Sequence, residues 1–242
     1  MPIYHKYCPP NQHYFNILAS RRIRVTQPAA LNDPFEMSGR LSRESLLRFV
    51  RENPNEIPGL AGLVAADLDG AVAQLQAKFA PINQQIVAQS GVICASSAWD
   101  SPPMWAHYCY NHTGFVIGFD GNVGVFRKMA AVKYADSPAA FEIPPTRESV
   151  EASMLTKGKV WSYENEHRVV GLLSECQDTG IEVDGHKIYL HELPEGCITE
   201  VTLGARMARD HAKSLSESAR ALGVKVFRAV CDLESVRLVR TG

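Results

Sequence analysis

Apolar and polar residues alternate over several short stretches of the chain, as they do in strands with one buried face. In the first stretch Ile3, His5 and Tyr7 share one face, and Tyr4 and Lys6 lie on the other. Eight more strands are predicted, at residues 22–26, 92–96, 114–119, 130–134, 169–173, 198–203, 225–230 and 236–239.

A hairpin is predicted late in the chain. Residues 181–183 and 187–190 read as strands, and Asp184-Gly185 between them has the composition of a two-residue hairpin turn. The hairpin therefore adds further antiparallel pairing.

Helical patterns separate the strands. Asn11 can cap a short helix that ends at Leu18. Residues 42–90 are rich in alanine, leucine and glutamine and predict helices, with interruptions at Pro54, Pro58, Gly70 and Pro81. Shorter helices are predicted within residues 102–108, 148–154 and 206–222.

This order of elements has no regular βαβ alternation. It favours the α+β class, with a mixed, largely antiparallel sheet core and a helical insertion at about residues 42–90. No linker-like segment or internal repeat interrupts residues 1–242, which indicates a single domain.

Charge and cysteine content limit the partners and the cellular compartment that are expected. The chain has 25 basic and 26 acidic residues, so its net charge of −1 does not indicate nucleic acid or an anionic membrane as partner. The N-terminal residues lack the pattern of a signal peptide, and no apolar run is long enough for a bilayer. The six cysteines form no CxxC pair and suit reduced thiols. A cytoplasmic protein is expected.

Two early segments carry more polar side chains than packing requires. On the opening strand, His5 and Tyr7 can act as hydrogen-bonding and stacking groups in a cleft, although a half-exposed edge strand explains them equally well. In residues 32–36, Asp33 precedes Pro34 and is held out of the helical region, so its carboxylate is presented from a rigid turn. A plain turn before a capped helix is the alternative.

The third segment, residues 104–114, is aromatic. Trp105, Tyr108 and Cys109 fall on one helical face, and Gly114 is expected to supply the positive φ of the helix exit. His107 and His112 are five residues apart, which is not the spacing of a helical zinc pair. His112 is therefore expected to be a polar site residue, and no metal site is predicted.

The fourth segment, residues 161–168, is the most informative. If it is extended, Glu164, Glu166 and Arg168 share one face. Two carboxylates this close repel, so one should have a raised pKa unless a cation compensates, which suits acid–base chemistry or stabilisation of a cation. Trp161 and Tyr163 favour a cleft over the alternative, a solvated strand start.

The order of these four segments resembles the bacterial family catalogued as domain of unknown function 2971. The matching residues are Tyr4 to Tyr7, Asn32 to Glu36, Met104 to Gly114 and Trp161 to Arg168. The resemblance implies one site assembled from the four segments, without naming a reaction. The sequence has no GxSxG, P-loop or GxGxxG motif that would name one.

A looser similarity is to ADP-ribosyltransferases, in the opening strand and in Glu164-Asn165-Glu166, although their Ser-Thr-Ser element is absent. It implies an enzyme using NAD as substrate, of the kind found among bacterial toxins and defence proteins. His5 would then bond the adenosine ribose, Tyr7 would stack near the nicotinamide, and Glu166 would stabilise the oxocarbenium-like transition state.

The expected catalytic residues are Glu164, Glu166, Arg168 and His112. The expected nucleotide-binding residues are Tyr4, His5, Tyr7, Asn32, Asp33, Trp105, Tyr108, Trp161 and Tyr163. Two other functions remain open on the same residues, a defence nuclease that does not use NAD and a non-catalytic nucleotide sensor.

Overall fold

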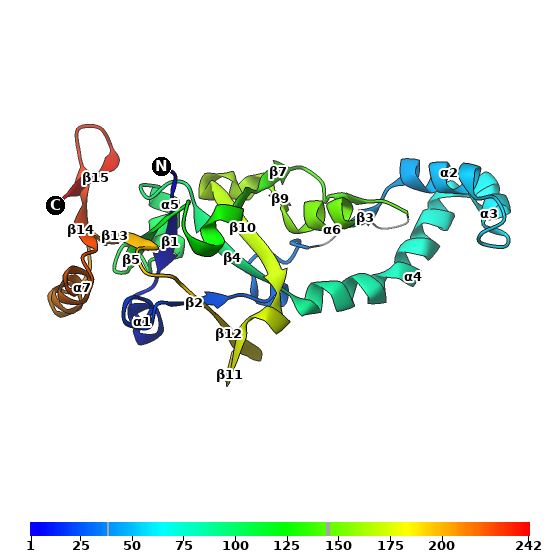
Figure 1. Cartoon of the computed structure of the whole chain (residues 1–242). Coiled ribbons are helices and arrows are strands. Elements are labelled where there is room, and N and C mark those ends of the chain that lie inside the picture. Colours follow the sequence, from blue (N-terminus) through cyan, green and yellow to red (C-terminus); the bar gives the residue numbers. More distant parts are fainter. Residues whose placement is uncertain (38, 144–145) are drawn as a thin grey trace.

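The computed structural model describes residues 1–37, 39–143 and 146–242, and its largest element is a twisted sheet (Figure 1). In this part of the chain the sheet has eight strands, in the order β15 (Arg237–Thr241), β14 (Lys225–Asp232), β13 (Ile198–Leu203), β5 (Phe115–Asp120), β1 (Ile3–Cys8), β4 (Ser90–Ser96), β10 (Glu166–Leu172) and β6 (Ala130–Ala131). Only β13 and β14 pair in parallel among these strands. The α+β class and the mixed, mostly antiparallel sheet are confirmed.

Smaller sheets flank the large one. One contains β11 (Gln177–Val183), β12 (His186–Glu192) and β2 (Arg22–Val25), and two strand pairs are β3 (Arg40–Leu41) with β8 (Ala140–Phe141) and β7 (Lys133–Ala135) with β9 (Thr156–Gly158). The turn between β11 and β12 has positive φ at both Asp184 and Gly185. This is the geometry a type I′ hairpin requires, and the predicted hairpin is present.

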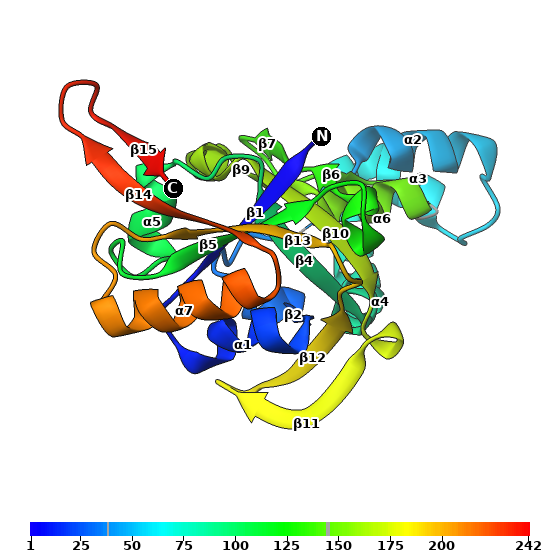
Figure 2. The same ribbon diagram turned by 60° about the vertical axis from the view of Figure 1, so that its left-hand side comes forward.

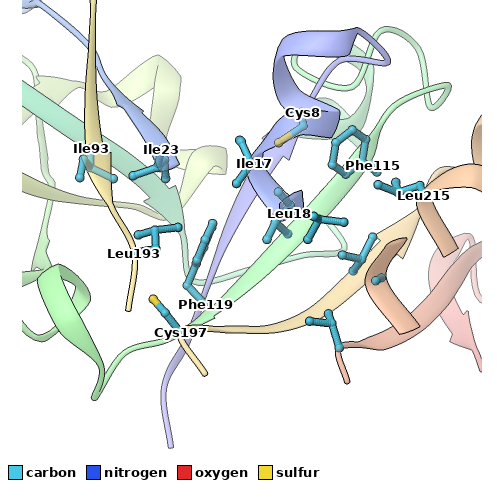
Figure 3. Close-up of a cluster of buried hydrophobic side chains, with 14 of the residues drawn as sticks. Cys8, Ile17, Leu18, Ile23, Ile93, Phe115, Phe119, Leu193, Cys197 and Leu215 are labelled. Carbon is cyan, nitrogen blue, oxygen red and sulfur yellow. The ribbon is translucent and has the colours of Figure 1, made fainter. Parts of the chain in front are cut away.

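Helices cover both faces of the large sheet. On one face, α1 (Gln12–Ser20) and α7 (Arg209–Ala221) pack against Phe115, Ile117 and Phe119 of β5 (Figures 2 and 3). On the other, α5 (Pro102–His107) packs Met104 and Trp105 against β1 and β5. Alternate residues of the strands supply these two cores, as the period of two requires.

The predicted helical segment forms an arm that extends away from the sheet (Figure 1). It consists of α2 (Arg43–Glu52), α3 (Leu60–Ala66) and α4 (Leu68–Gln89). The predicted breaks at Gly70 and Pro81 are wrong, because α4 runs through both residues. The break lies at Asp67, whose side chain accepts a hydrogen bond from the Gly70 amide and caps α4.

Short helices complete the chain. They are η1 (Pro28–Ala30), η2 (Gly124–Lys128), α6 (Arg147–Met154), η3 (Lys159–Glu164) and η4 (Leu173–Glu175). Residues 161–168 are therefore extended only from Glu166 onward, so Glu164 does not share a strand face with Glu166 and Arg168. Within the described ranges, no helix has the length and apolar character needed to cross a membrane.

The exit from α5 also differs from its prediction. Positive φ occurs at Tyr110, Asn111 and His112 and not at Gly114. Gly114 is needed for another reason, because a Cβ there would lie 2.1 Å from the Cys8 carbonyl oxygen. The backbone of the turn thus lies against β1 at Gly114.

Candidate functional site

A cavity of about 240 Å³ lies beside the junction of β1 and β4. The two strands pair only at His5 and Ser96, and the neighbouring residues Tyr7 and Cys94 also line the cavity. β1 pairs with β5 along its whole length. The incomplete pairing with β4 therefore leaves an opening in the sheet that side chains from other segments surround.

One wall of this cavity is a cluster of buried charges. Lys157 of β9 lies 2.6 Å from Glu164, 2.9 Å from Glu36 and 3.4 Å from Glu166, measured from Nζ to the nearest carboxylate oxygen. The side chains of Lys157, Glu36 and Glu164 are 2%, 1% and 3% exposed. Such burial is tolerable only because the charges are paired.

Arg168 completes the cluster. Its Nε and Nη2 donate to the two carboxylate oxygens of Glu166, at 2.9 and 2.8 Å, and Nη2 also donates to Glu36 at 2.7 Å. Nη1 donates to the Met154 carbonyl, so the guanidinium is held on three sides. The cluster contains three carboxylates and two cations, an excess of one negative charge when all are ionised.

The chain direction at Asn165 makes this convergence possible. Glu164 ends η3, Asn165 adopts a left-handed conformation with φ of 44°, and Glu166 begins β10. Asn is one of the few residues that adopt this conformation at low cost. Glu164 and Glu166 thus both reach Lys157, although they do not lie on one strand.

The two glutamates have opposite pKa shifts. Burial raises the pKa of Glu164, and its hydrogen bonds from Lys157 and Tyr108 only partly oppose this. Burial acts in the same direction on Glu166, but the hydrogen bonds and charges of Arg168 and Lys157 outweigh it and lower the pKa to about 2. Glu166 is therefore an anion at neutral pH, whereas Glu164 holds its proton to a higher pH than an ordinary glutamate does.

Tyr108 connects the cluster to Asn32, which also lines the cavity. Its hydroxyl donates to Glu164 Oε1 at 2.5 Å and accepts from Asn32 Nδ2 at 2.9 Å. Burial, followed by the hydrogen bond to Glu164, raises the pKa of Tyr108. The hydroxyl therefore stays protonated and keeps its donor role.

His5 also lines the cavity and is held by Glu200 of β13, which does not. Its Nε2 lies 3.2 Å from Glu200 Oε1, and Arg240 donates to the same oxygen at 2.6 Å. Although burial opposes it, the hydrogen bond from His5 and the charge of Arg240 lower the pKa of Glu200. The other ring nitrogen of His5, Nδ1, is buried and has no hydrogen-bond partner in the part of the chain that is described.

The structure thus brings many of the expected site residues together. The expected residues that line the cavity are His5, Tyr7, Asn32, Tyr108, Glu164 and Glu166. Arg168 acts from behind Glu166. Tyr7 donates its hydroxyl proton to the Ala98 carbonyl at 3.0 Å and packs its ring edge-on against Trp105.

Six other expected residues do not line the cavity. Tyr4 packs against His167, and Asp33 accepts a hydrogen bond from the Phe35 amide within its own turn. Trp105 is fully buried and donates to the Trp99 carbonyl. The remaining three are His112, stacked on the Trp105 ring; Trp161, beneath the Lys157 ammonium; and Tyr163, hydrogen-bonded to His107.

Two residues of the cluster were not selected from the sequence. Glu36 belongs to residues 32–36, but the sequence pattern there points to Asn32 and Asp33 as the site residues. Lys157 belongs to none of the four segments. The sequence indicates Lys157 only indirectly. Glu164 and Glu166 have one cation, Arg168, within their own segment, so a second cation has to come from elsewhere in the chain.

Comparison with known families gives one match. The model of a family described as protein of unknown function (DUF2971) matches residues 104–169. The resemblance to this family is confirmed over that segment, which carries Tyr108, Lys157, Glu164, Glu166 and Arg168. Searches of curated proteins and of solved structures found no match.

Proposed function

We propose that the chain is an ADP-ribosyltransferase-like enzyme that uses NAD as its substrate. The observation that carries the proposal is the pair of buried glutamates on the cavity wall, one held ionised and the other with a raised pKa. Opposite shifts in neighbouring acids are typical of sites that divide charge stabilisation and proton transfer between two groups.

The reaction suits these two roles. The bond between C1′ of the ribose and the nicotinamide nitrogen breaks, its electron pair neutralises the pyridinium, and an oxocarbenium-like cation develops at C1′. Glu166, as a fixed anion, stabilises that cation. An acceptor then bonds to C1′ and loses its proton to Glu164, whose pKa is raised.

His5, Tyr7 and Asn32 are placed to hold the nucleotide. They lie on the cavity wall with Tyr108, and the free Nδ1 of His5 is available to a ribose hydroxyl. The near-neutral net charge also suits a small nucleotide better than a nucleic acid.

A nucleotide sensor is a second candidate. Leu31 and Glu36 line both this cavity and a second one, of about 490 Å³, against α4 of the helical arm. A ligand that moved Glu36 would therefore also change the cavity beside the arm. The nuclease alternative is less well supported, because His112 stacks on Trp105 outside the cavity lining.

The test is nicotinamide release from labelled NAD by the purified protein in a cell lysate, compared with Glu166→Gln. This variant leaves two carboxylates for the two cations, so it should fold. We expect release to fall by about 100-fold or more while NAD still binds. Glu192→Gln, on an exposed position of β12, should keep full activity.

Tyr108→Phe gives an independent readout. Removing the hydroxyl takes away a hydrogen bond that lowers the pKa of Glu164, so the acidic limb of the rate profile should move to higher pH. A wild-type protein that binds NAD without releasing nicotinamide would instead support the sensor. Absence of both binding and release would contradict the proposal.

A further inference from the structure

Two further cations line the cavity. They are Lys6 of β1 and Arg24 of β2, and Tyr14 and Thr26 line it as well. The same cavity therefore contains the glutamate cluster, with its excess of one negative charge, and two positive side chains outside that cluster.

These two cations are not neutralised by the protein. Within residues 1–37, 39–143 and 146–242, neither Lys6 nor Arg24 forms an ion pair, and the buried Nε of Arg24 has no hydrogen-bond partner. Lys157, in contrast, is paired with three glutamates. An unpaired buried donor is costly, so its retention in a cavity points to a ligand that satisfies it.

The positive field extends to a neighbouring helix. Burial first, and then the charges of Arg24 and Lys6, lower the pKa of His13 in α1. The two cations therefore act on the same region, which is the arrangement that binds an anion with more than one charge.

We propose that Lys6 and Arg24 form a phosphate subsite for the diphosphate bridge of the nucleotide, which orients its glycosidic bond toward Glu164 and Glu166. The identity of the bond that is broken rests on the proposed function, but the binding of the diphosphate does not. A cavity of about 240 Å³ is smaller than the roughly 300–1,000 Å³ of sites that enclose a whole ligand. Only the diphosphate and the ribose beside it would be enclosed.

The test is calorimetric titration of the full chain with inorganic pyrophosphate and with ADP-ribose, in buffer free of divalent metals. We expect Arg24→Gln and Lys6→Met each to weaken binding of both probes about ten-fold or more. Arg24→Lys, which keeps the charge, should lose less. Arg22→Gln is the matched control, because Arg22 is an exposed residue of the same strand that does not line the cavity.

The outcomes separate this inference from the proposed function. Equal affinities in Arg24→Gln and Arg22→Gln, or no binding of either probe to the wild type, would overturn the phosphate subsite. Nicotinamide release with an unchanged KM in Arg24→Gln and Lys6→Met would also overturn it while leaving the enzyme intact. Probe binding that depends on Arg24, without nicotinamide release, would keep the subsite and contradict the enzyme.

Discussion

Lys157 is the residue on which the three buried glutamates most depend, because it is within 3.4 Å of all of them. Burial lowers the pKa of its ammonium, but the surrounding Glu166, Glu36 and Glu164 outweigh this and raise it. The ammonium therefore remains charged throughout the physiological range. Without it, Arg168 alone would face three carboxylates.

We predict that Lys157→Met destabilises the protein by about 3–5 kcal/mol at pH 7, since it leaves buried carboxylates uncompensated. Part of the loss should be recovered near pH 5, because Glu164 already has a raised pKa and would take up a proton. Urea unfolding at the two pH values measures both effects.

Lys159→Met provides the matched control for this change. Lys159 pairs with Asp136, but the two side chains are 61% and 76% exposed, so the loss should stay below about 1 kcal/mol. Equal stabilities of the two variants at pH 7 would show that Lys157 is not the compensating charge.

Site residues that lie close together in the chain could be predicted from the sequence. Alternation placed Glu166 beside Arg168, and their ion pair is present. It could not find Lys157, because Lys157 reaches the cluster through the pairing of β9 with β7 and the contact of β9 with η3. Nor could it select Glu36, whose contact with Arg168 spans 132 residues of chain.

At the scale of elements, a row of cross-strand partners explains how the main sheet supports the site. Glu200, Gly118, His5, Ser96 and Glu166 are successive partners across β13, β5, β1, β4 and β10. Partners in a sheet point to the same face. Glu200 reaches His5 across Gly118, where a Cβ would lie 2.4 Å from Glu200 Cγ.

Gly118→Ala should therefore destabilise the protein by about 1–3 kcal/mol, because Glu200 must move away from His5 and Arg240. Gly171→Ala tests the same substitution on β10, where a Cβ would meet nothing within 4 Å. It should be neutral or stabilise by up to about 1 kcal/mol. Thermal unfolding of both variants measures the two effects. A Gly118→Ala variant as stable as the wild type would contradict the close contact between Gly118 and Glu200.

The elements themselves were largely predictable, because the strands and helices have strong patterns. The errors lie where tertiary contacts override local preference. The pattern predicts an interruption of the helical run at Pro81, yet Pro81 lies inside α4, which bends along its length (Figure 1). The order of strands in the sheet could not be read from the pattern, because neighbours such as β1 and β4 are distant in sequence.

At the scale of the whole molecule, the charge cluster makes stability depend on pH. The pKa of Glu166 is about 2 in the folded protein, against an ordinary value of 4.5. Its contribution is present above pH 4.5 and is lost as the pH falls from there toward 2. The contribution of Glu164 has the opposite sign, since its pKa is raised.

We predict that Glu166 contributes on the order of 3 kcal/mol at neutral pH, and that this amount disappears by about pH 2. The measurement is the free energy of unfolding as a function of pH for the wild type and for Glu166→Gln. Below pH 4.5 the free energy of unfolding should fall less steeply with pH in the variant than in the wild type. Parallel acid branches for the two proteins would mean that Glu166 is not held ionised by the fold.

The position of Arg168 and Glu166 on β10 also limits how the chain can misfold. A shift of β10 by one residue against β4 would exchange its two faces and move both charges away from Lys157 and Glu36. That arrangement would bury ions without partners, at a cost of several kcal/mol. The charged cluster therefore disfavours the shifted alignment of β10 against β4. A chain in that alignment would also lack the site.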